Sequence, residues 1–164
     1  VQFPARRSVW TSFAAIAAAV LFVALIISVF VLWKQNREMK DEMARSNEFV
    51  KLLTTPGSRM AELAGTAQAS SATAKIAYDK NGHAMLMAHG LPPAPQGKEY
   101  QLWYIVGSKA PMPGKSFAPD DKGQGTLTDE MPHEAMDSAV FAITLEPAGG
   151  MPAPTGEIYL RSGL

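Results

Sequence analysis

Residues 9–33 read VWTSFAAIAAAVLFVALIISVFVLW, and this stretch decides how the chain is organised. It contains no charged residue. A continuous helix of this length, at about 1.5 Å per residue, would extend about 37 Å and cross a hydrocarbon core of about 30 Å. Trp10 and Trp33 stand near its ends, where indole rings prefer the headgroup layer. We therefore predict one transmembrane helix over residues 9–33, preceded by a cytoplasmic remnant over residues 1–8.

Two other interpretations of this stretch fit less well. A cleaved signal peptide has a shorter apolar core, about 7 to 15 residues, followed by small residues at the cleavage site, whereas this stretch ends in Leu32-Trp33-Lys34. A buried helix of a soluble protein usually carries polar residues along one face. The stretch is therefore expected to stay in the mature protein as an anchor.

Residues 34–55 are predicted to continue the helix as a stalk, to about Leu53. Acidic and basic residues alternate here, as on a solvated helix. Thr54-Thr55-Pro56-Gly57 then ends the helix, because proline has no amide hydrogen to donate. The apolar positions of the stalk follow a four-three spacing and form one stripe: Met39, Met43, Val50 and Leu53, with Ser46 between them. This stripe fits a dimeric coiled coil or a monomeric stalk. It covers barely two heptads and includes a serine, which favours the monomer.

Residues 56–164 change to short runs rich in valine, isoleucine, tyrosine and threonine, separated by glycine and proline. Such runs are typical of strands and turns, and seven of them in about a hundred residues indicate an all-β, sandwich-like domain. Asp79-Lys80-Asn81-Gly82 predicts a hairpin, because Asn-Gly accepts positive φ angles. Proline-rich segments such as Pro111-Met112-Pro113-Gly114 are expected to be loops at the sheet ends. The predicted strands are residues 59–63, 73–78, 83–88, 98–106, 125–128, 139–145 and 157–161.

The strand at residues 98–106 is apolar on nearly both faces. Tyr100, Leu102 and Tyr104 alternate with Gln101 and Trp103 along it. A strand of this kind is expected inside a sheet with both faces covered.

Several short motifs follow one another between residues 72 and 161. They are Gly90-Leu91-Pro92-Pro93, Tyr100-Gln101-Leu102-Trp103, Pro113-Gly114 before Phe117, Ala142-Ile143-Thr144-Leu145-Glu146-Pro147-Ala148-Gly149-Gly150, and Pro154-Thr155-Gly156. In order and spacing these motifs resemble the C-terminal domain of the anti-sigma-K factor (RskA-type) family, and the Glu-Pro-Ala-Gly-Gly stretch is specific.

The resemblance implies a membrane-anchored anti-sigma factor. Members of the family span the membrane once, hold a sigma factor with a cytoplasmic N-terminal domain, take part in sensing through an extracytoplasmic C-terminal domain, and release the sigma factor by regulated proteolysis. The chain begins at Val1 and shows no counterpart of the sigma-binding helices. It is therefore expected to be a fragment that anchors and senses, with a sigma factor bound through a missing N-terminal domain, and with the membrane and possible membrane proteases as further partners.

The charges that flank the predicted span and the family resemblance predict opposite orientations in the membrane. Four basic residues follow the predicted span within a short distance and two precede it, which by the positive-inside rule favours a cytoplasmic C-terminal domain. Long folded domains translocate largely regardless of such charges. The resemblance implies the inner (plasma) membrane, with the C-terminal domain extracytoplasmic.

The overall composition argues against nucleic-acid binding and catalysis. Fifteen basic and fifteen acidic residues leave a formal net charge of zero, so no global field attracts phosphate backbones. The sequence has no cysteine, no nucleophile elbow and no phosphate-binding loop, so we predict that it is not an enzyme and needs no cofactor.

One local pattern suggests a different function. On a strand, His83, Met85, Met87 and His89 would line one face, and thioethers with imidazoles suit Cu(I). Neighbours on that face are about 6 to 7 Å apart, too far for all four to reach one ion without bending. The alternatives are methionines that fill the core, with the histidines in solvent. A metal- or ligand-binding surface protein is therefore the alternative function, and a purely structural envelope anchor is a third.

Overall fold

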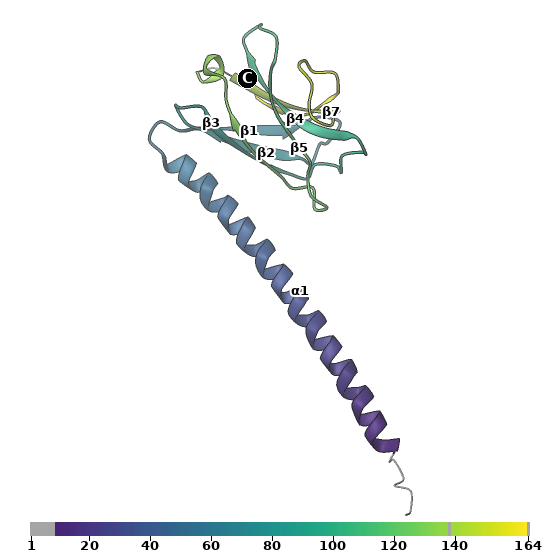
Figure 1. The fold of residues 1–164 in the computed structure, drawn as a ribbon. Helices are drawn as coiled ribbons and strands as arrows, with labels where there is room; N and C mark the ends of the chain where they lie inside the picture. Colours follow the sequence, from purple (N-terminus) through teal and green to yellow (C-terminus); the bar gives the residue numbers. More distant parts are fainter. Residues whose placement is uncertain (1–8, 138, 164) are drawn as a thin grey trace, which may run out of the picture. The chain divides into compact units, whose positions relative to one another are not determined.

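The computed structural model describes residues 9–137 and 139–163, and the cytoplasmic remnant predicted at residues 1–8 lies outside this described part. The chain divides into two compact units, one ending at Asn47 and the other beginning at Glu48. The first unit contains most of the single long helix α1, and the second contains the end of that helix and all the strands (Figure 1).

Helix α1, Val9–Thr54, is unbroken over 46 residues. Its segment Ala18–Arg37 has a mean hydropathy of 2.2 and is long and apolar enough to cross a membrane. This segment is a candidate span, as the uncharged stretch predicted. Near its end the guanidinium of Arg37 lies 4.2 Å from the centre of the Trp33 ring, a cation–π contact that suits the membrane boundary.

Helix α1 ends close to the residue expected. The hydroxyl groups of Thr54 and Thr55 each donate to the carbonyl oxygen of Lys51 at 3.0 Å, which satisfies an acceptor of the last turn. Pro56 follows, and Gly57 has a φ of 87°, a left-handed conformation that glycine adopts without strain. The proline and the glycine together stop the helix and turn the chain toward the first strand.

Eight antiparallel strands form one sheet in the order β5-β4-β7-β8-β1-β2-β3-β6. The predicted hairpin joins β2 to β3, with Gly82 at a φ of 91°. A short 3-10 turn, His133–Ala135, precedes β7. The strands are β1 (Arg59–Gly65), β2 (Thr73–Tyr78), β3 (His83–His89), β4 (Lys98–Val106), β5 (Met112–Phe117), β6 (Gly125–Glu130), β7 (Ala139–Pro147) and β8 (Ile158–Ser162).

Strand β5 corrects the sequence analysis, which expected the segment around Pro113 to be a loop. β5 is an edge strand that pairs only with β4 in the sheet. Proline is tolerated at an edge because its missing amide hydrogen removes no bond to a second neighbour. The pairing with β4 also shifts register between Gln101 and Trp103, so the two strands are joined by an irregular ladder.

The sheet curls so far that its two edge strands come close, which gives a nearly closed barrel. The carboxylate of Asp129 on β6 accepts a hydrogen bond from the backbone amide of Lys115 on β5 at 2.9 Å. The same carboxylate oxygen accepts from the Tyr104 hydroxyl at 3.0 Å. The two-sheet sandwich is not confirmed, because all eight strands belong to one continuous ladder.

The barrel interior is filled mainly by aromatic and branched side chains. Tyr104 packs edge-on against Phe141 at 5.9 Å between ring centres, and Tyr78 lies 5.5 Å from the same ring. Strand β4 is buried on both faces as predicted, with Tyr104 in the interior and Trp103 on the outer side, both fully buried. The other fully buried large core residues include Leu63, Ile76, Leu86, Tyr100, Leu102, Ile143 and Leu160.

Candidate functional site

The candidate functional site is the junction at which the chain passes from α1 into the barrel, within the second unit. Phe49, in the last turns of α1, is 8% exposed and packs with Ala77 of β2 and Met85 of β3. Leu52 and Met87 are partly buried against the same cluster. Phe49 and Leu52 are three residues apart and therefore share a helix face. The last turns of α1 are thus docked on the outer face of β2 and β3.

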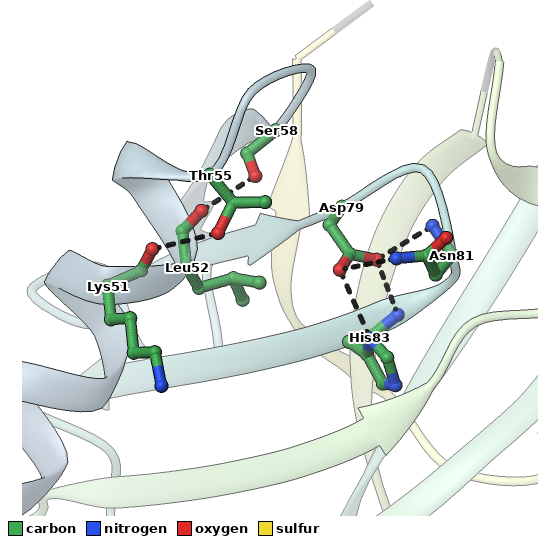
Figure 2. A network of polar contacts seen from close by, with 7 residues as sticks. All are labelled: Lys51, Leu52, Thr55, Ser58, Asp79, Asn81 and His83. Atoms are coloured by element: carbon green, nitrogen blue, oxygen red, sulfur yellow. Dashed lines mark hydrogen bonds and ion pairs between the residues drawn. The ribbon is translucent and has the colours of Figure 1, made fainter.

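Hydrogen bonds fix the chain just after this docked helix end. The Ser58 hydroxyl donates to the carbonyl oxygen of Leu52 at 2.6 Å, and the Thr55 hydroxyl donates to the carbonyl oxygen of Lys51 at 3.0 Å (Figure 2). The backbone amide of Thr55 also donates to Leu52 at 3.1 Å. The carbonyl groups of Lys51 and Leu52 are therefore satisfied, and the path into β1 at Arg59 is defined.

A buried carboxylate organises the neighbouring hairpin. Asp79 is 6% exposed and accepts hydrogen bonds from the backbone amides of Asn81 at 2.8 Å and His83 at 3.0 Å. Its other oxygen contacts Nδ1 of His83 (Figure 2), and the two atoms are 3.1 Å apart. Burial alone would raise the pKa of Asp79, but the hydrogen bonds from His83 and Asn81 outweigh it and lower that pKa below the ordinary value. Asp79 is therefore an ionised acceptor that shapes the turn.

A cavity of about 280 Å³ lies beside the junction. Arg59 crosses its wall and donates to the carbonyl oxygens of Met136 at 3.1 Å and Asp137 at 3.2 Å. The remaining lining residues are Gly57, Tyr78, Asp79, Lys80 and His133. Both charge signs line the cavity, which suits a small polar ligand better than an apolar one.

The structure places the four copper candidates along β3 but does not bring them together. Met85 is 2% exposed beneath Phe49, and Met87 packs partly against the same cluster, so both thioethers serve as apolar filler. His83 is exposed and holds Asp79, whereas His89 is exposed at the opposite end of the strand. Among the described residues, no three His, Cys, Asp or Glu side chains group as metal ligands. The copper site stays a prediction.

A second buried carboxylate, Glu146 on β7, fastens the following loop. It is fully buried and accepts hydrogen bonds from the Thr144 hydroxyl at 2.6 Å, from the hydroxyl and amide of Thr155, and from the amide of Gly156 at 3.1 Å. Trp103 donates to the Thr144 hydroxyl at 2.8 Å and extends the network. Burial would raise the pKa of Glu146, but these donors lower it instead. Glu146 is an acceptor that holds the fold.

Two further side chains hold the same loop from β4. Gln101 accepts from the Met151 amide at 2.7 Å and donates to the Met151 carbonyl oxygen at 3.0 Å. Glu99 accepts from the Ser116 hydroxyl at 2.5 Å and from the Gly149 amide at 3.3 Å, and these two bonds lower its pKa. The loop that carries the Glu-Pro-Ala-Gly-Gly motif is therefore tied to the barrel at several points.

Sequence reasoning missed the docking role of Phe49 and Leu52. Both residues lie off the four-three stripe of the stalk, and that departure was the available signal. Which surface they cover depends on long-range pairing of β2 and β3 and was not readable from the sequence.

The geometry defines a class of protein: a nearly closed β-barrel domain that follows a candidate membrane helix. In the described part of the chain, every buried polar side-chain atom has a hydrogen-bond partner, and the buried carboxylates organise turns. The chain belongs to the family described as anti-sigma-K factor rskA, C-terminal, which matches residues 12–158. The match includes most of α1 as well as the barrel. This family is regulatory, which is consistent with the prediction that the chain is not an enzyme.

Similar proteins carry related names. The chain is 30% identical over 156 residues to the anti-sigma-K factor RskA of Mycobacterium tuberculosis and to the dysfunctional anti-sigma-K factor RskA of Mycobacterium bovis, covering 93% of this chain and 61% of each relative. It is 27% identical to an uncharacterized protein in the phr 5'region of Streptomyces griseus, over 93% of this chain and 63% of that protein. The chain thus spans less than two thirds of the length of these relatives. No solved structure matches it.

Proposed function

We propose that this chain is the membrane anchor and extracytoplasmic sensory domain of an anti-sigma factor that regulates sigma-factor-dependent transcription. The observation that carries the proposal is the extent of the family match, which joins the candidate span and the barrel in one unit. A module of this kind acts by binding and by being cut, and it needs no catalytic group of its own.

The sigma factor is bound by a part of the protein that this chain does not contain. The relatives named as anti-sigma-K factors are longer than the region they share with this chain, and the remainder has room for a sigma-binding domain. The barrel lies outside the inner membrane, as the family resemblance implies. The basic residues after the span do not exclude this orientation, because long folded domains translocate largely regardless of flanking charges. Membrane proteases end the inhibition by cutting the chain near the helix.

The junction is the place where a change in the barrel reaches the helix. Phe49 and Leu52 hold the last turns of α1 on β2 and β3, and Ser58 and Thr55 close the turn that follows. A signal that loosens this docking exposes the backbone between Thr54 and Arg59 to a protease. Segments without such packing and hydrogen bonds are the ones that open most easily.

The test of the proposed orientation uses two fusions after Leu164. Alkaline phosphatase folds into its active form outside the membrane, and a fluorescent reporter that matures only in the cytoplasm serves as its counterpart. An active phosphatase with a dark reporter supports the extracytoplasmic barrel. A fluorescent reporter with an inactive phosphatase overturns it.

Ligand binding by the barrel is a second candidate function, favoured by the cavity of about 280 Å³ beside the junction. Arg59 and Lys80 give it cationic groups, and Asp79 and Asp137 give it acceptors. A small zwitterionic or anionic molecule fits this lining. A thermal-shift screen of such compounds tests it, with Lys80→Ala expected to abolish any shift that arises in this cavity.

A further inference from the structure

The apolar residues of the stalk divide into two sets with different surroundings. Phe49 and Leu52 are covered by the barrel. The other large apolar residues after Lys34 remain exposed, and every one of them lies on the four-three stripe. They are Met39 (60% exposed), Met43 (62%), Val50 (53%) and Leu53 (38%). A helix in water does not normally leave such a continuous stripe uncovered.

The stripe keeps a heptad register over the described helix. If Met43 and Val50 occupy the a positions, Met39, Ser46 and Leu53 occupy the d positions, and the preceding a position is Asn36. A single asparagine at an a position is the device by which two-stranded coiled coils fix their partner and register, because two asparagines hydrogen-bond across the seam. Asn36 is exposed in the structure.

The same register continues into the candidate span. Phe22 and Val29 fall on a positions, Leu25 and Leu32 fall on d positions, and all four are exposed. Because α1 is unbroken from Val9 to Thr54, no kink interrupts the seam between the membrane part and the stalk. Two heptads alone favoured a monomeric stalk, but the unbroken helix lengthens the seam and the barrel accounts for the apolar residues that lie off it.

A second copy of this chain carries the same stripe and can cover it. Two copies anchored by the same span cross the membrane in the same direction and at the same depth, which imposes a parallel, in-register pair and raises their effective concentration. In that pair Gln35 of one copy faces Lys40 of the other, so like charges do not oppose there. A different protein would need a hydrogen-bonding residue opposite Asn36 and a membrane span at the same depth.

We infer that the chain is a parallel homodimer in the membrane, held by a heptad seam that runs through Asn36, Met39, Met43 and Ser46 and is continued by Val50 and Leu53. The inference rests on the membrane span of the proposed function but not on which side the barrel lies. Two barrels and two anchored N-terminal segments are thereby presented together.

The experiment uses the natural absence of cysteine. Single variants Met39→Cys, Met43→Cys, Ser46→Cys and Val50→Cys are expressed as the full 164-residue chain in membranes and oxidised, and the dimer is measured on a non-reducing gel. Asp41→Cys and Glu48→Cys occupy the f positions, opposite the seam, and are the matched controls. The four residues replaced in the seam are exposed, so the barrel folds in each variant.

The expected result is several-fold more disulfide dimer at the a and d positions than at the f positions, with maxima alternating at four and three residues. Equal cross-linking at all positions, or none at any, overturns the dimer. Asn36→Lys placed on Met43→Cys is expected to reduce the dimer several-fold, and an unchanged yield contradicts the assigned seam. A cytoplasmic barrel with a cross-linked seam would overturn the proposed orientation alone, and an outer barrel without cross-links would overturn the dimer alone.

Discussion

Replacing Phe49 by alanine should detach the last turns of α1 from the barrel without unfolding the barrel itself. Truncation of a phenylalanine in a protein core costs about 3 to 5 kcal/mol. Phe49 is 8% exposed, but its cluster lies on one outer face of β2 and β3 and contains only Ala77 and Met85 as buried partners. Full burial of such a side chain contributes about 1.5 to 3 kcal/mol, so we take about 2 kcal/mol for the lost docking.

The quantity to measure is hydrogen exchange of the backbone amides at residues 48–55 in the full chain, in lipid nanodiscs. A loss of about 2 kcal/mol raises the population of the opened helix end, and hence its exchange rate, by about thirtyfold. Amides of β4 and β7 should keep the wild-type rate, because the main core is separate from the Phe49 cluster. Limited proteolysis between Thr54 and Arg59 should accelerate in parallel.

Glu48→Ala is the control for this prediction, because Glu48 is next in sequence but exposed and lies off the heptad seam. It shortens a side chain in the same helical turn and should leave the exchange of residues 48–55 within about threefold of wild type. If Phe49→Ala and Glu48→Ala give the same exchange rates, the docking of α1 on the barrel is refuted.

Three further predictions concern the barrel. Glu146→Gln should lower the free energy of unfolding by about 2 to 3 kcal/mol, because an amide nitrogen cannot accept the bonds that the carboxylate accepts. The folded-state pKa of Glu146 lies below the unfolded value of about 4.3. The stabilisation by this carboxylate is therefore complete above the unfolded pKa and is lost as the pH falls through the folded pKa. The variant should accordingly lose less stability in acid than the wild type, as measured by circular dichroism. Gly150→Ala should destabilise the barrel more than Gly149→Ala in thermal unfolding. Both glycines have φ near 80° to 90°, but only at position 150 would a Cβ approach Gln101, at 3.2 Å. Equal losses of stability would contradict the close packing of Gln101 against Gly150. Met85→Leu should lower the free energy of unfolding by less than about 1.5 kcal/mol. A competition titration with a Cu(I) chelator should give the same result for the variant and the wild type. Weaker copper binding by the variant would support the metal site.

Local sequence patterns sufficed for the parts of the fold that are local. The strands at residues 73–78 and 98–106 have the predicted ends, because the Asn-Gly turn marks the first and an alternating apolar run marks the second. Strand β5 escaped detection because Pro113 argues against a strand unless its place at an edge is known. The closure of the barrel through Asp129 and Lys115 joins residues on two strands that are not neighbours in the ladder, and no local pattern encodes that pairing.

The candidate site divides in the same way. The hairpin at Asp79 was predicted because its signal lies within four residues. The methionines of β3 were visible as a same-face pair, but what covers that face is Phe49, which lies far away in the sequence. The alternation of side chains along a strand identifies the residues that share one face of the sheet. It does not show whether a ligand, solvent or another element covers that face.

Several residues of the motifs that carry the family likeness hold the fold together. Trp103, Thr144 and Glu146 form one buried network, and a Cβ at Gly156 would lie 2.0 Å from the Leu145 carbonyl oxygen, so glycine is required there. Groups that are buried and fully bonded cannot meet a new ligand without loss of the fold. Under the proposed sensory function, these buried members of the motifs are therefore not the groups that meet a signal. Barrel packing, a polar cavity and the end of α1 meet at the junction, so a signal bound there would change the helix docking directly, whereas one bound at the motif loop would act through the barrel.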